Sequence, residues 1–152
     1  MLGNVTAVLV SDGGEPFEKL ELALNSQGIK TYRARSSAEV VVLLEHPDSP
    51  QMIFTDTTFP RGTWADALSL AARHFVPVIV VSRRMDLELY VDSLERGAFD
   101  FIVPPFVSAD LAHIVKCAAW HRSNPRVRQA LQAGRPVISR PKEGSGQEIE
   151  QR

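Results

Sequence analysis

The sequence predicts a three-layer α/β sandwich, in which one parallel sheet is covered by helices on both faces. Short apolar segments alternate five times with longer segments whose apolar residues recur at helical spacing, and such alternation is typical of a parallel sheet with crossover helices. Three of the apolar segments are continuous runs without polar alternation, which indicates strands buried on both faces. A length of 152 residues favours one domain.

The five expected strands cover residues 6–10, 29–34, 52–55, 78–82 and 101–103. The second of them reads Ile-Lys-Thr-Tyr-Arg-Ala and alternates in polarity. Such alternation suits a strand at the edge of the sheet, where one face meets solvent.

Helical segments fill the intervals between these strands. They run over residues 16–27, from a cap at Ser37 to residue 45, from a cap at Thr63 to about residue 74, over residues 85–96, and onward from a cap at Ser108. Ser and Thr are expected to begin these helices because their side chains accept hydrogen bonds from the free N–H groups of the first turn. Gly28 and Gly97 are the expected stops of the first and fourth helices.

Composition excludes several classes of function. The net charge of −1 gives no overall attraction to nucleic acid or to anionic membranes. The lone Cys117 rules out an internal disulfide and a zinc site built of cysteines. No apolar run approaches the ~20 residues that a membrane helix needs. The first residues lack the pattern of a signal peptide, so a cytoplasmic location is expected.

Two carboxylates stand where expected strands end. Asp56 closes the run Met-Ile-Phe-Thr, and Asp12 follows the run that ends in Ser11. A carboxylate at the end of a buried strand is costly unless it has a partner or a task. Because the carboxyl ends of parallel strands meet at one edge of the sheet, this pair suggests a metal or phosphoryl site.

Four segments together resemble the receiver domain of bacterial response regulators. They are Val-Leu-Val-Ser-Asp at 8–12, Ile-Phe-Thr-Asp at 53–56, Val-Ile-Val-Val-Ser at 78–82 and Gly-Ala-Phe-Asp-Phe-Ile-Val-Pro-Pro-Phe at 97–106. The similarity covers about residues 5–119. It implies a flavodoxin-like fold of five parallel strands in the order 2-1-3-4-5 with five helices. It also implies a role in two-component signalling, with no enzymatic activity expected.

The resemblance implies roles for particular residues. In this family a histidine kinase or phosphotransfer protein donates a phosphoryl group to the aspartate that ends the third strand, which is Asp56 here. Mg²⁺ is held by that aspartate, by an acidic pair after the first strand that includes Asp12, and by a backbone carbonyl that corresponds to Thr58. Ser82 matches the hydroxyl residue that binds the phosphoryl group, and Phe101 matches an aromatic residue that reports the switch.

The sequence departs from the family pattern at two functional positions. Gly13 stands where the second acidic residue belongs, and Pro104 stands where a lysine belongs. Loss of one carboxylate should weaken Mg²⁺ binding, because Mg²⁺ prefers hard oxygen ligands in octahedral geometry. Loss of the lysine removes fixed positive charge that phosphoryl transfer requires. The bond between Pro104 and Pro105 is expected to be cis, as the family's corresponding bond commonly is.

Arg83 and Arg84 follow Ser82 directly. Arg83 is a candidate charge substitute, because its guanidinium could replace the missing lysine if it folds over the pocket. Its bulk could equally block Asp56. Two solvated arginines at the entrance of a helix are the alternative.

These features leave two versions of a signalling function. In one, Asp56 is phosphorylated with Mg²⁺ and switches a protein-binding face; in the other, the domain is a pseudo-receiver that regulates by binding alone. A haloacid-dehalogenase-like phosphatase would need a carboxylate at Thr58, and a flavodoxin would need a Ser/Thr-rich loop in place of residues 11–15.

The division of the chain is expected at residue 120. Residues 1–120 would form the receiver domain, and residues 121–152 a basic extension with a short helix followed by a disordered tail or linker. From residue 121 to residue 142 there are six Arg/Lys and no acidic residue.

The family's usual partner face is formed by the fourth helix, the fifth strand and the fifth helix. Apolar residues at 87, 89, 90 and 91 exceed one buried stripe, which is compatible with a homodimer or another partner interface through that face. The default interpretation is an amphipathic helix with a wide buried face. Neither membrane nor nucleic acid is an expected partner of the receiver domain.

Overall fold

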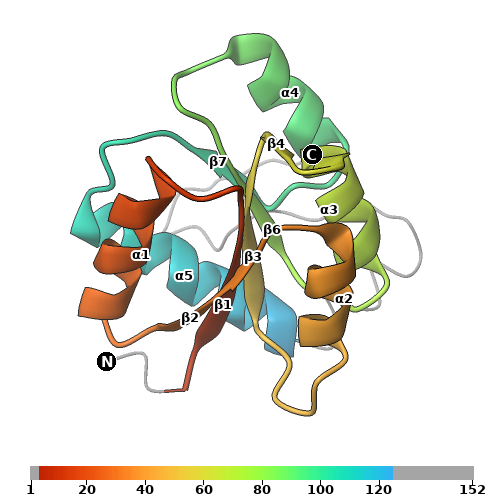
Figure 1. Ribbon diagram of the computed structural model, residues 1–152. Coiled ribbons are helices and arrows are strands. Elements are labelled where there is room, and N and C mark those ends of the chain that lie inside the picture. Colours follow the sequence, from red (N-terminus) through yellow and green to blue (C-terminus); the bar gives the residue numbers. More distant parts are fainter. Residues whose placement is uncertain (1–3, 125–152) are drawn as a thin grey trace, which may run out of the picture.

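The computed structural model describes residues 4–124, which form a five-stranded parallel sheet between two layers of helices (Figure 1). The strand order is β2-β1-β3-β6-β7, and it is the predicted order 2-1-3-4-5 because a small hairpin takes the labels β4 and β5. The strands are β1 (Thr6–Val10), β2 (Lys30–Ala34), β3 (Met52–Asp56), β6 (Val78–Val81) and β7 (Asp100–Ile102). The alternating strand β2 lies at the edge, as its polarity predicts.

The helices divide between the two faces of the sheet. Side chains of α1 (Phe17–Ser26) and α5 (Ser108–Ser123) pack in one apolar cluster with the sheet. Side chains of α2 (Ser37–Leu44), α3 (Trp64–Ala72) and α4 (Leu87–Glu95) pack in clusters on the opposite face. The continuous apolar runs of β1, β3 and β6 are buried along almost their whole length, which confirms that both faces are covered.

Several helix starts differ from the predicted positions. Ser36, not Ser37, caps α2, and its side chain accepts a hydrogen bond from the Glu39 N–H. Ser108 is the first residue of α5 and caps nothing, since Val107 occupies the cap position without a side-chain bond. The prediction at Thr63 is confirmed, because Thr63 and Asp66 form a reciprocal capping box at α3. Helix α4 begins at Leu87, later than predicted, because Asp86 caps it.

The chain after β3 forms an antiparallel hairpin that the sequence did not predict. Strands β4 (Thr58–Phe59) and β5 (Gly62–Thr63) pair between β3 and α3. Phe59 is buried among α2 and α3 side chains, and its ring lies so close to Gly62 that a Cβ at that position would clash with ring carbon Cε1. The hairpin therefore has a core contact of its own, directly beside Asp56.

A cis proline bond and a C-terminal extension are also predicted from the sequence. The Pro104–Pro105 bond is cis, as predicted, and the Glu15–Pro16 bond is cis as well. The expected short helix and tail of the basic extension lie outside the described residues, although α5 continues past residue 120 to Ser123. Within residues 4–124, no helix has the length and apolar character that crossing a bilayer requires.

Candidate functional site

The strand ends bring the predicted site residues to one edge of the sheet. Asp56 ends β3 and lies opposite Val81 of β6 in the parallel register. Thr55 of β3 lies opposite Val10 of β1. Residues that follow β1, β3 and β6 therefore leave the sheet at the same level, and the loops that carry Asp12, Thr58 and Ser82 start there.

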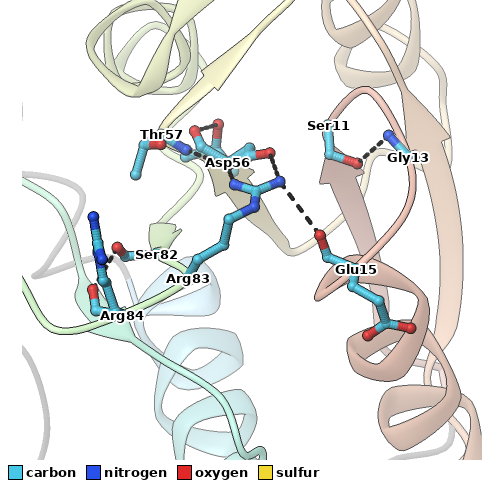
Figure 2. Close-up of polar contacts among 9 residues, drawn as sticks. Ser11, Gly13, Glu15, Asp56, Thr57, Ser82, Arg83 and Arg84 are labelled. Carbon is cyan, nitrogen blue, oxygen red and sulfur yellow. Dashed lines mark hydrogen bonds and ion pairs between the residues drawn. The ribbon is translucent and has the colours of Figure 1, made fainter.

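Asp56 is a buried carboxylate that forms an ion pair with a guanidinium group. Only 3% of the residue is exposed. Arg83 donates from Nη1 to Oδ1 at 2.8 Å and from Nη2 to Oδ2 at 3.1 Å, a bidentate ion pair (Figure 2). The Thr57 N–H also donates to Oδ1 at 2.8 Å. The charge that burial would make unfavourable is thus neutralised within the chain.

Arg83 reaches this position from the loop after β6. Its side chain is half exposed on its outer side, while its Nη2 also donates to the Glu15 carbonyl at 3.4 Å (Figure 2). The hydrogen bond with Asp56 raises the pKa of the Arg83 guanidinium; burial opposes this rise and the charge of Asp56 adds to it. Arg83 is thus bound to Asp56 and is not the fully solvated arginine of the third alternative; the contact is compatible both with a charge substitute and with a block of Asp56.

Ser82 follows β6, the strand that pairs with β3, but its hydroxyl contacts its own loop. The residue is buried, and its N–H extends the ladder by donating to the Ile102 carbonyl at 3.0 Å. Its Oγ donates to the Arg84 carbonyl at 2.7 Å, within its own loop (Figure 2). A role for Ser82 in phosphoryl binding stays a prediction that would require this bond to break.

Asp12 pairs with an arginine that follows the neighbouring strand β2. Its side chain is 63% exposed and pairs with Arg35, whose Nε lies 3.2 Å from Oδ1. Arg35 follows β2, and β2 and β3 flank β1 on opposite sides. The hydrogen bond to Asp12 raises the pKa of Arg35. The two carboxylates expected to share a metal therefore each contact a separate guanidinium.

The other site positions inferred from the family have no charged side chain. Thr58 lies exposed in β4 and pairs with Thr63 across the hairpin. Pro104 has no ionisable group, and Gly13 donates its N–H to the Ser11 Oγ at 3.1 Å (Figure 2). Phe101 is buried, with its ring centroid 5.6 Å from that of Tyr90 of α4 in an edge-on contact.

This arrangement does not fit a divalent metal. Mg²⁺ requires oxygen ligands that converge on one point. Asp12 and Asp56 face different arginines, and nowhere in residues 4–124 do three His, Cys, Asp or Glu side chains form a group that could hold a metal ion.

Three participants escaped prediction from the sequence, two of them backbone groups. The Glu15 carbonyl and the Thr57 N–H are backbone groups, which leave no trace in side-chain identity. Arg35 could have been found, because it follows β2 directly, as Ser11 and Asp12 follow β1, and the register pairs Val10 with Ala34.

Comparison with known proteins gives one consistent family. The model of the response regulator receiver domain matches residues 8–116. The chain is 30% identical over 119 residues to the transcriptional regulatory protein PrrA of Mycobacterium tuberculosis, covering 77% of this chain and 51% of PrrA. It is 26% identical over 132 residues to the transcriptional regulatory protein CpxR of Klebsiella pneumoniae, covering 86% of this chain and 56% of CpxR. The chain thus spans about half the length of these relatives.

Solved receiver domains have a similar fold. A response regulator receiver protein from Pseudomonas putida is 26% identical, with a TM-score of 0.62 over 74% of this chain and 95% of that one. The receiver domain of a sensor histidine kinase from Pseudomonas aeruginosa has a TM-score of 0.62 at 20% identity, over 74% of this chain and 94% of that one. That structure has a magnesium ion coordinated in its active-site cleft. At this identity the likeness shows the fold alone.

Proposed function

This chain belongs to the response regulator receiver domain family, and from that premise we propose that it is a signalling module that acts by binding proteins, without phosphoryl transfer to Asp56. The observation that carries the proposal is the bidentate pair between Arg83 and both Asp56 oxygens. A phosphoryl group and its cation would have to occupy the place of that guanidinium.

The charge balance around Asp56 supports the same conclusion. Phosphoryl transfer relies on cations that are fixed where negative charge develops. Here Pro104 supplies none, Gly13 removes one metal ligand, and Asp12 contacts Arg35 instead of a shared ion. Arg83 supplies one positive charge, but that charge is already balanced by Asp56.

The partner surface proposed for this module is the face of α4, β7 and α5. Met85, Leu87 and Val91 in and before α4 are 57%, 68% and 43% exposed, so they form no part of the core. Exposed apolar side chains gathered on one element mark interaction surfaces in soluble proteins. The partner we propose is a second copy of this chain.

The second candidate function is that of a phosphoacceptor, favoured by the buried position of Asp56 beside Ser82. A histidine kinase or phosphotransfer protein would be the partner, and Asp56 would form a P–O bond as the P–N bond to histidine breaks. Arg83 would first have to leave both carboxylate oxygens. The Mg²⁺ ligands inferred from the family, Asp12, Asp56 and the Thr58 carbonyl, do not fit a metal as they are arranged here.

Intact-mass spectrometry distinguishes the two candidates. The full chain and its Asp56→Asn variant are incubated with Mg²⁺ and either acetyl phosphate or phosphoramidate, beside a receiver domain known to accept phosphoryl groups. We expect the mass of both forms to remain unchanged while the reference domain gains one phosphoryl group. A gain in the parent chain that Asp56→Asn abolishes would refute the proposed function and establish the second candidate.

A further inference from the structure

The guanidinium of Arg83 joins three segments of the chain at the carboxyl edge of the sheet. The side chain belongs to the loop after β6, it holds both oxygens of Asp56 at the end of β3, and it reaches the Glu15 carbonyl ahead of α1. Figure 2 shows the guanidinium between these two acceptors. Arg83 therefore links segments that are distant in the sequence; the nearer of its two partners, Asp56, is 27 residues away.

The chemistry of these contacts is that of a resident cation. A carboxylate that is 3% exposed needs a compensating charge within bonding distance. A planar guanidinium meets both of its oxygens at once, whereas an ammonium group would act as a single point charge. The remaining donor capacity of Nη2 goes to a backbone carbonyl, so the cation is bound by oxygen atoms from the end of β3 and from the loop before α1.

The second carboxylate of the edge has a cation of its own. Asp12 contacts Arg35, which follows β2. Each acidic group is therefore neutralised by an arginine from a neighbouring strand end.

We propose that Arg83 is the built-in cation of the Asp56 site and takes the place of a divalent metal, so that the domain is metal-independent. This deepens the proposed function and rests on it, because a receiver that bound a phosphoryl group through Mg²⁺ would need the same Asp56 oxygens. Arg83 acts as a positioning residue that joins the loop after β6 to the end of β3 and to the loop before α1.

Thermal unfolding with and without Mg²⁺ tests this assignment. The parent chain, Arg83→Gln and the matched control Arg84→Gln are each measured in millimolar MgCl₂ and in EDTA. We expect the parent and Arg84→Gln to have the same Tm in both buffers. Arg83→Gln should melt about 3–8 °C lower in EDTA, since its buried carboxylate is unpaired. MgCl₂ should restore part of that loss, because a divalent cation can then reach Asp56.

Each contrary outcome overturns the assignment. If Mg²⁺ raised the Tm of the parent chain as much as that of Arg83→Gln, the metal would bind in the presence of Arg83. If Arg83→Gln had the same Tm as Arg84→Gln, Arg83 would not compensate the charge of Asp56. If MgCl₂ left the lower Tm of Arg83→Gln unchanged, Arg83 would not occupy the position of a cation.

A double variant covers the case in which Arg83→Gln does not fold. Asp56→Asn/Arg83→Gln removes both charges, so it should fold and lose less than the sum of the single losses; strict additivity would contradict the pairing. An incorrect assignment of Arg83 can be distinguished from an incorrect proposed function. A parent chain that is labelled by acetyl phosphate yet insensitive to Mg²⁺ would remove the proposed function and leave the assignment of Arg83 intact.

Discussion

At the scale of single residues, Asp56 shows what a sequence can and cannot reveal about a site. Its place at the end of a buried strand could be predicted, because the apolar run before it has no polar alternation. The side-chain torsions that bring Arg83 onto it could not, since two solvated arginines fit the same sequence. The contact with the Glu15 carbonyl depends on backbone direction, for which residue types give no signal.

The pair between Asp56 and Arg83 should stabilise the native state by a modest amount. We expect Asp56→Asn to lower the free energy of unfolding by about 1–2 kcal/mol. The loss stays below that of a fully buried pair because Arg83 is half exposed and can regain water. Urea unfolding at neutral pH measures it as a lower midpoint at unchanged slope. A higher midpoint would mean that burial of the carboxylate costs more than Arg83 returns.

At the scale of elements, the strands could be predicted to within a residue or so, and the helix starts less well. Strand bounds follow apolar runs, whereas a helix start depends on which of two adjacent hydroxyls has the extended backbone of a cap. Ser36 has that conformation and Ser37 is already helical. The β4–β5 hairpin escaped prediction because Thr-Phe and Gly-Thr are too short to show a period, and the burial of Phe59 decides its structure.

Adjacent serines provide a matched test of the observed cap. Ser36→Ala should destabilise the domain by about 1 kcal/mol, because the Glu39 N–H loses its acceptor. Ser37→Ala should be close to neutral, since alanine is at least as favourable as serine within a helix. Thermal or urea unfolding of both variants measures the contrast. Equal losses would show that the cap is shared, and a larger loss for Ser37→Ala would restore the position predicted from the sequence.

At the scale of the whole molecule, the topology could be predicted almost completely. Burial of the three central runs required helices on both faces, and the resemblance supplied the strand order that the structure has. The fate of apolar residues on α4 was harder to predict, since a helical pattern does not tell how wide the buried face is. Leu89 and Tyr90 are partly buried against the sheet, whereas Leu87 is 68% exposed.

The proposed self-association concerns the α4 side of the molecule. Leu87→Glu should shift the chain towards the monomer without lowering its Tm, because Leu87 is largely exposed and an isologous interface would place the charge twice at its centre. Val42→Glu is the matched control, since Val42 is 69% exposed on the remote helix α2. Light scattering across a concentration series gives the result. A parent chain that is monomeric throughout, or equal effects of the two variants, would exclude this interface.

The two arginines that hold Asp12 and Asp56 have a consequence for how this domain meets its surroundings. A counter-ion that belongs to the chain has an effective concentration set by the geometry of the fold and not by the solution. Chelators and changes in the cellular magnesium pool would therefore leave the pair of Arg83 and buried Asp56 as it is. Such a domain would report the presence of its partner and not the ionic state of the cell.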